Sequence, residues 1–222
     1  SHVPGSHAPE SVVIAAVQSI EALGCDVSAA EELIPEGLDA LKRNDMKALQ
    51  RITARIFNIL FMCPSVTSSD YWKSKLYQSF NEYEKVIEFP ESAAETLPNA
   101  VLYDKTKAAW LGRLCGGGLG TALEGDTTAQ LKKKFGEIRT YVRNPNTYND
   151  DITYEIAFLE ACCKAQGMPT SADIADQWLE LIPCGWSAEQ VALDNLRRGM
   201  YPPESGLFRN PYREWIGAQM RG

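Results

Sequence analysis

Apolar residues recur at intervals of three and four along most of the chain, which is the pattern of helices that bury one face. Residues 10–23 carry such a face, and Gly24 ends it. Asp45 is placed to cap a longer helix that runs to Met62, again with apolar residues spaced for burial. No segment alternates apolar and polar residues for long enough to predict a strand. The pattern therefore predicts an all-α protein.

Capping residues and prolines predict where the other helices begin and end. Each expected helix starts at a Ser, Thr, Asp or Asn whose side chain can accept a hydrogen bond from a backbone N–H of the first turn. The expected caps are Ser28 (helix ending at Pro35), Ser69 (ending at Pro90), Asp126 (through Phe135), Asn149 (through Ala165), Thr170 or Ser171 (ending at Pro183), Ser187 (through Arg198) and Asn210 (beginning at Pro211).

A stripe of small residues runs through residues 108–125. Ala108, Gly112, Gly116, Gly120 and Glu124 recur every fourth residue, so a helix places them on one face. Each glycine in a helix costs about 0.5–1 kcal/mol relative to alanine, and three at one period require a compensating contact. Close packing of another helix is the favoured explanation from this stretch alone, and a ligand lying against bare backbone is the alternative.

Charge and composition narrow the possible partners. The 222 residues hold 22 Lys and Arg against 29 Asp and Glu, a net charge of −7, and 45% are hydrophobic. The only basic run, residues 132–134, is interpreted as a solvated helix face, so nucleic acid is not expected to be the main partner. Arg113 and the shortness of the apolar run around it argue against a membrane-spanning helix and a membrane partner.

The six cysteines include no C-x-x-C pair. Because no secretion signal is recognisable ahead of them, we expect reduced, mostly buried thiols in a cytoplasmic protein, with a disulfide framework as the weaker alternative. The two histidines, His2 and His7, lie within residues 1–9, which we expect to be a flexible N-terminus or a remnant of cloning. The rest of the chain therefore contains no Ser-His-Asp, Cys-His or histidine-ligated zinc site.

Two adjacent carboxylates, Asp150 and Asp151, follow Asn149. In the simplest interpretation Asn149 caps a helix and the two acids face its positive end. The functional alternative is a metal site, since two carboxylates and an amide oxygen are suitable ligands for a hard cation such as Mg²⁺.

Three stretches together resemble the ADP-ribosylglycohydrolase family: residues 109–125, residues 148–153 and residues 202–221. The resemblance implies a compact multi-helix all-α domain, a centre that binds two Mg²⁺ ions, and a hydrolase that removes ADP-ribose from modified proteins or small ADP-ribosyl molecules. It covers residues 96–222 and leaves residues 10–95 as a helical N-terminal segment without a chemical motif.

The resemblance implies roles for individual residues. The family's Ser/Thr-Asp-Asp-Thr motif matches Asn149, Asp150, Asp151 and Ile152, so the first three are the expected metal ligands. Glu124, in a Glu-Gly pair, and Asp151 are the expected catalytic carboxylates. The residues expected to contact substrate are Gly116, Gly120, Thr121, Arg209 and Asn210, although a helix cap also explains Asn210.

The second metal motif of the family, Asp-x-Asp-Ser/Thr, does not occur after residue 153. We therefore expect the domain to be incomplete at its C-terminus, with a missing C-terminal half or self-association covering what is exposed. Two functions follow from the resemblance. The first is an Mg²⁺-dependent hydrolase of the glycosidic bond to ADP-ribose. The alternative is a catalytically incomplete relative that binds ADP-ribose or a nucleotide, or docks a protein partner.

Overall fold

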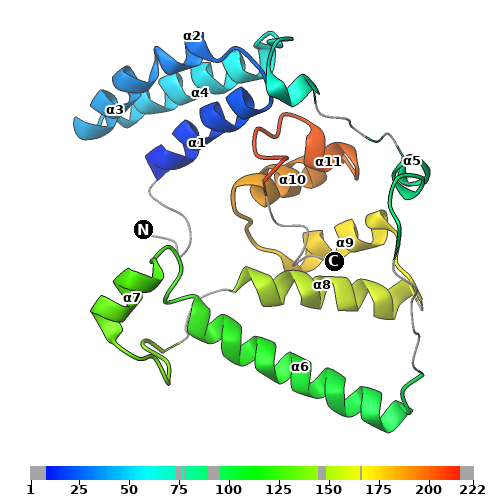
Figure 1. The fold of residues 1–222 in the computed structure, drawn as a ribbon. Helices are drawn as coiled ribbons and strands as arrows, with labels where there is room; N and C mark the ends of the chain where they lie inside the picture. Colours follow the sequence, from blue (N-terminus) through cyan, green and yellow to red (C-terminus); the bar gives the residue numbers. More distant parts are fainter. Residues whose placement is uncertain are drawn as a thin grey trace.

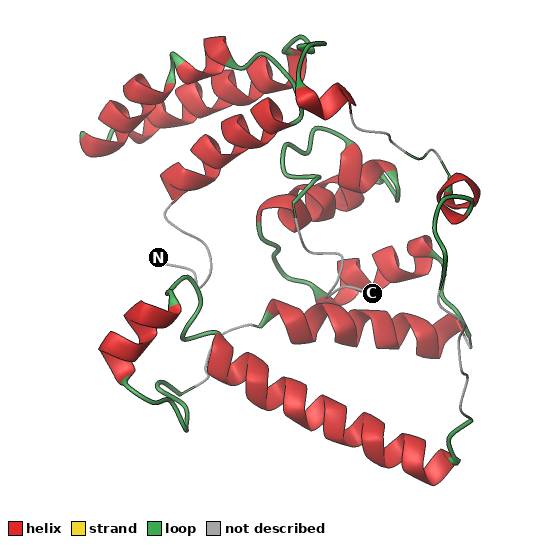
Figure 2. Ribbon diagram, in the orientation of Figure 1, coloured by secondary structure: helices red, strands yellow, loops and turns green. Residues whose placement is uncertain are grey.

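The computed structural model describes residues 9–73, 77, 79–89, 96–144, 149–165 and 167–215 (Figure 1). Helices and the loops between them make up this part of the chain (Figure 2). Its only β pairing is an isolated antiparallel bridge between Cys25 and Ser65, and no strand forms among these residues. The all-α prediction is confirmed.

The helices follow the order of the sequence pattern, with one short 3₁₀ turn between α4 and α5. Their bounds are α1 Pro9–Ala22, α2 Ser28–Glu31, α3 Ile34–Lys42, α4 Met46–Met62, η1 Asp70–Lys73, α5 Phe80–Glu84, α6 Asn99–Gly120, α7 Thr128–Phe135, α8 Asp150–Ala165, α9 Ser171–Leu181, α10 Ser187–Arg197 and α11 Glu204–Leu207.

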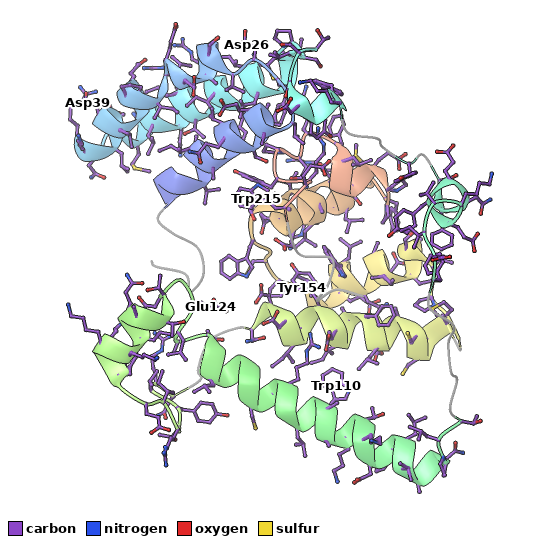
Figure 3. The ribbon with its side chains drawn as sticks, viewed as in Figure 1. Asp26, Asp39, Trp110, Glu124, Tyr154 and Trp215 are labelled. Atoms are coloured by element: carbon purple, nitrogen blue, oxygen red, sulfur yellow. The ribbon has the colours of Figure 1, made fainter. Side chains whose placement is uncertain are left out.

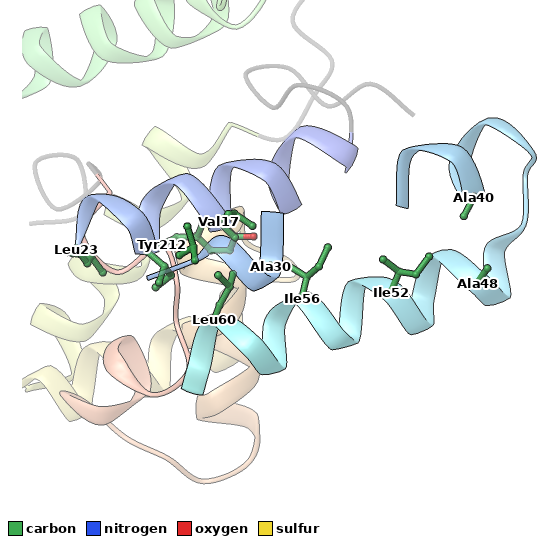
Figure 4. Close-up of a cluster of buried hydrophobic side chains, with 12 residues drawn as sticks. Val17, Leu23, Ala30, Ala40, Ala48, Ile52, Ile56, Leu60 and Tyr212 are labelled. Carbon is green, nitrogen blue, oxygen red and sulfur yellow. The ribbon is translucent and has the colours of Figure 1, made fainter. Parts of the chain in front are cut away.

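Helices α1 to α4 enclose the first hydrophobic core (Figure 4). Ile52, Ile56 and Leu60 recur every fourth residue along α4 and are almost completely buried against Val17 of α1 and Ala30 of α2. This is the apolar spacing that predicts one buried face. The pattern of the N-terminal segment is therefore accounted for by its own core.

A second, smaller core lies between α8, α9 and α10. Tyr154 of α8 is 1% exposed, and its ring centroid lies 4.6 Å from that of Trp178 of α9. Leu193 of α10 completes this core, while Val191 of the same helix packs against the first core. Helix α10 therefore joins the N-terminal segment to the C-terminal helices.

The C-terminal loop strengthens that connection. Tyr212 is buried in the first core and its hydroxyl donates to the carbonyl oxygen of Val12 at 3.1 Å. Ser19 of α1 donates to the Pro211 carbonyl oxygen at 2.8 Å and accepts from Trp215 Nε1 at 3.1 Å. Residues 211–214 form turns, and the remainder of the helix expected from Pro211 lies outside the described residues.

The caps of three helices are as predicted. Asp45 accepts from the Ala48 N–H at 3.0 Å at the start of α4. Asn149 accepts from the Ile152 N–H at 3.1 Å at the start of α8. Of the two candidates for α9, Thr170 is the cap, and it forms a reciprocal capping box with Asp173.

Three other capping predictions are wrong. Ser28 is the first residue inside α2 and hydrogen bonds to Asp26, while Pro35 lies in the first turn of α3, where proline is well tolerated. Thr127 caps α7 in place of Asp126, because its hydroxyl and Gln130 satisfy each other's backbone N–H groups. Trp186 precedes α10, and no side chain caps that helix.

The long helix predicted from Ser69 to Pro90 is also wrong. Its described residues form only the turn η1 and the short helix α5. Trp72 donates from Nε1 to the Gly24 carbonyl oxygen at 3.0 Å, which fixes η1 against the end of α1. Phe80 is 65% exposed and stacks only with nearby aromatic rings, so no core holds this segment in one continuous helix.

The cysteine prediction needs correction in one respect. All six cysteines are free thiols, as expected, but none is fully buried, and Cys115, Cys163 and Cys184 are exposed. Desolvation and the neighbouring Cys25 thiol raise the pKa of Cys63 to about 11.

Within the part of the chain that the structure describes, no helix is both long and apolar enough to cross a membrane.

Candidate active site at the junction of α6 and α8

Helices α6 and α8 lie side by side and antiparallel, so that the C-terminal end of α6 meets the N-terminal end of α8 (Figure 1). The residues predicted to carry the chemistry come from this junction. Gly116 and Gly120 belong to the last turns of α6, Thr121 is its C-cap and Glu124 follows. Asn149 precedes α8, and Asp150 and Asp151 are its first two residues. Trp110 lies on the side of α6 that faces α8 (Figure 3).

The row of α6 residues that touches α8 is Arg113, Gly117 and Thr121. A Cβ atom at Gly117 would lie 3.1 Å from Asn149 Nδ2 and 3.5 Å from Ile152 Cδ1. Thr121 Oγ1 accepts a hydrogen bond from Asn149 Nδ2 at 3.1 Å. Glycine at position 117 allows this close approach, because a Cβ there would force the side chain of the α8 cap to shift by a few tenths of an ångström.

The predicted stripe of Gly112, Gly116 and Gly120 has a different environment. A Cβ built at any of the three meets no atom of the described residues within 4 Å. In this part of the chain, close helix packing, the favoured explanation of the stripe, is therefore not found at these glycines, and the close approach is made by Gly117. A rotation of one residue along the helix, about 100°, separates the two rows. The backbone of Gly116 and Gly120 is left open on its outer side.

Asn149 connects the two helices through both ends of its amide. Its Oδ1 accepts from the Ile152 N–H, and its Nδ2 donates to Thr121. Thr121 in turn donates from Oγ1 to the Gly117 carbonyl oxygen at 2.8 Å. Capping thus uses one lone pair of the amide oxygen and leaves the other for a further ligand.

The carboxylates of Asp150 and Asp151 are half-buried at the first turn of α8. Among the described residues, no lysine or arginine forms an ion pair with either of them. Arg113, the nearest cation in the contact row, instead donates from Nη2 to the backbone carbonyl oxygen of Asp151 at 3.4 Å and pairs with the carboxylate of Glu155. In the described part of the chain, only the N-terminus of α8 therefore offsets these two negative charges.

Glu124 belongs to the same electrostatic environment. Partial desolvation raises the pKa of its carboxyl group, and the negative charges of Asp150 and Asp151 raise it further. Its side chain is nevertheless exposed to solvent beyond the end of α6 (Figure 3). The fold therefore brings the two predicted catalytic carboxylates, Glu124 and Asp151, close enough for their negative charges to repel each other.

The carboxylate and amide oxygens at the junction are of the chemical type that Mg²⁺ binds. Mg²⁺ is commonly held by one or two carboxylates and keeps several water ligands, and the paired aspartates supply such a set without a competing cation. Within the described residues, however, no group of three or more His, Cys, Asp and Glu side chains is placed to hold a metal ion together. Glu124 is thus near the pair without completing a cage.

Arg209 and Asn210 lie apart from the junction. Asn210 is 2% exposed, and its Nδ2 donates to the carbonyl oxygens of Ala188 and Gly206 at 3.1 and 3.0 Å. The Arg209 guanidinium lies 5.5 Å from the ring centroid of Phe61 on α4. These contacts are with α4, α10 and the α11 loop, so the structure does not bring the two residues to Glu124 and the aspartates. A role for them in substrate binding stays a prediction.

Arg113 and Gly117 were not among the residues expected at the site. Their signal in the sequence is the spacing of four residues from Arg113 to Gly117 and to Thr121. That spacing competes with the equally regular row of Gly112, Gly116 and Gly120. Only the packing of α8 shows which row faces it.

Comparison with known proteins identifies the C-terminal part of the chain. A family model described as ADP-ribosylglycohydrolase matches residues 98–222, which is more than half of the chain, and leaves the N-terminal segment outside the match. No curated protein and no solved structure matches the chain.

Proposed function

Because the chain belongs to the ADP-ribosylglycohydrolase family, we propose that it is an Mg²⁺-dependent hydrolase that cleaves a glycosidic bond to ADP-ribose. The family implies ADP-ribosyl substrates, either small molecules or modified proteins. One observation of the structure supports the proposal most strongly. In the described part of the chain, Asp150 and Asp151 form no ion pair and their charges raise the pKa of Glu124, which is a costly arrangement unless a cation or a reaction uses it.

In this proposal Asp150 and Asp151 hold Mg²⁺, with Asn149 Oδ1 as a third oxygen ligand. When bound, Mg²⁺ supplies charge stabilisation for the ribose hydroxyls and the attacking water. Holding water and ribose together also removes much of the entropic part of the barrier. A complete family member is expected to hold two such ions, of which these residues account for one.

Glu124 is proposed as the base. A carboxylate with a raised pKa accepts a proton more readily near neutral pH, and Asp151 is the second candidate for this role. Water adds its oxygen to the anomeric carbon as the bond to the leaving group breaks. One proton goes to the carboxylate and then to the leaving group. The products are ADP-ribose and the freed side chain or alcohol.

The open backbone of α6 is proposed to bind the substrate. Gly116 and Gly120 present main chain without side chains, and Thr121 offers a hydroxyl beside them. A sugar or phosphate can approach such a surface closely because no Cβ intervenes. This role corresponds to the alternative explanation of the glycine stripe, in which a ligand lies against bare backbone.

A catalytically incomplete binding module is the alternative function. Two observations favour it: the described residues do not gather three metal-binding side chains, and the cap of α8 already uses one lone pair of the Asn149 amide oxygen. Such a protein would bind ADP-ribose or a nucleotide at the same junction without turnover.

Hydrolysis of ADP-ribosyl-arginine and ADP-ribosyl-serine peptides, followed by chromatography of released ADP-ribose, tests the proposal. We expect release with Mg²⁺, loss with a chelator, and a fall of at least about 100-fold in Asp150→Ala/Asp151→Ala. The control is Asp70→Ala/Asp104→Ala, which removes two exposed carboxylates elsewhere. Normal turnover by the first variant would refute the assignment. ADP-ribose binding without release would support the alternative.

A further inference from the structure

One arginine of α6 reaches two successive turns of α8. The guanidinium of Arg113 donates from Nη2 to the carbonyl oxygen of Asp151, in the first turn, and forms an ion pair with Glu155, four residues later. The side chains of Arg113 and Glu155 are 37% and 23% exposed, so the pair is partly shielded from water. Such a pair stabilises more than one on the open surface.

The shape of the guanidinium matters to this contact. Its N–H groups are fixed in one plane, so it can hold two acceptors at once in a defined orientation. A lysine ammonium has no such plane, so it would hold the same acceptors in a less defined orientation. Together with the fit of Asn149 over Gly117, the arginine sets how far α8 is rotated and displaced relative to α6.

We propose that Arg113 is a positioning residue of the active site. By holding the Asp151 backbone and Glu155, it fixes the first turn of α8, and hence the carboxylates of Asp150 and Asp151, relative to Glu124. The inference rests on the proposed function, because it assumes that these carboxylates bind Mg²⁺. It assigns a role outside the metal ligands and the catalytic carboxylates.

Glu155 has a second part in this arrangement. Its negative charge engages the Arg113 guanidinium, which also donates to the backbone carbonyl oxygen of Asp151. Without Glu155, the positive charge of Arg113 would be left at the first turn of α8 without this partner, where it would oppose a bound cation. Loss of Glu155 is therefore expected to weaken Mg²⁺ binding through Arg113.

Calorimetric titration of Mg²⁺ into the chain, alongside kcat and KM for ADP-ribosyl peptide hydrolysis, tests the inference. In Arg113→Met we expect the dissociation constant of Mg²⁺ to rise about tenfold, the size typical of losing a partner of a metal ligand. We also expect kcat to fall with KM little changed. Arg113→Lys should recover only part of both. Arg139→Met, which removes the exposed pair with Glu137, is the matched control.

Glu155→Gln keeps the inference testable if Arg113→Met does not fold. It should weaken Mg²⁺ binding alone, and have no further effect when combined with Arg113→Met, because the two residues act through one contact. Wild-type Mg²⁺ affinity and kcat in a folded Arg113→Met or Glu155→Gln chain would overturn the positioning role and leave the proposed function standing. A wild-type chain that neither binds Mg²⁺ nor hydrolyses the peptides would overturn both.

Discussion

The backbone of Gly117 lies directly against the side-chain amide of Asn149, at a distance where a Cβ would approach Nδ2 to 3.1 Å. This contact joins the end of α6 to the cap of α8. It determines how the Mg²⁺ ligands proposed at the start of α8 face Glu124. It also separates Gly117, which packs against α8, from Gly112, Gly116 and Gly120, where an added Cβ meets no described atom within 4 Å.

Alanine substitutions at neighbouring glycines should therefore have opposite effects on stability. Gly116→Ala adds a methyl group in open space and should raise the free energy of unfolding by about 0.5–1 kcal/mol through helix propensity. Gly117→Ala gains the same propensity but must displace Asn149, which two hydrogen bonds hold in place.

Urea unfolding of the two variants measures the difference. We expect Gly117→Ala to be at least about 1 kcal/mol less stable than Gly116→Ala, given the usual cost of an overpacked contact. Equal stabilisation by both substitutions would show that α6 and α8 do not meet at Gly117. A loss of activity in Gly116→Ala without loss of stability would support a substrate on the open face.

Removal of the α8 cap should affect both stability and the metal site. Asn149→Ala loses the bond to the Ile152 N–H and the bond to Thr121, and should cost about 1 kcal/mol of unfolding free energy. Thr170→Ala removes the corresponding cap of α9 and should cost a similar amount. Only Asn149→Ala is expected to weaken Mg²⁺ binding in a calorimetric titration. Equal Mg²⁺ affinities in the two variants would exclude Asn149 from the metal site.

The burial of Tyr212 should make stability depend on alkaline pH. Burial raises the pKa of its phenol to about 12, while the phenol has a pKa near 10 when the chain is unfolded. Between about pH 10 and pH 12 the unfolded chain loses a proton that the folded chain retains. The free energy of unfolding therefore falls as pH rises through this window, by up to about 1.4 kcal/mol per pH unit from this group.

Tyr212→Phe isolates that contribution. The stability advantage of the wild type over this variant should shrink from pH 9 to pH 12 in urea unfolding, because phenylalanine has no proton to lose. The exposed Tyr103→Phe change is the control, for which the corresponding difference should stay nearly constant. A difference for Tyr212→Phe that does not change with pH would contradict the burial of Tyr212 in the first core.

Local signals in the sequence predicted much of this protein. The periodic apolar residues predicted the all-α fold, and Asp45, Asn149 and Thr170 cap the helices that they precede. A cap and a buried stripe depend on neighbours within about one turn of helix, so the chain itself carries this information. The adjacency of Asp150 and Asp151, and the resemblance that identified the family, are likewise properties of the sequence.

Tertiary contacts decided the rest. Asn210 donates from Nδ2 to the carbonyl oxygen of Ala188 in α10, 22 residues away along the chain. The sequence offered two rows of equal regularity along α6, and one residue of rotation separates them. Because both rows have the same spacing, the helix alone does not show which row packs. Among the described residues, α8 packs on Arg113, Gly117 and Thr121 and leaves Gly116 and Gly120 open.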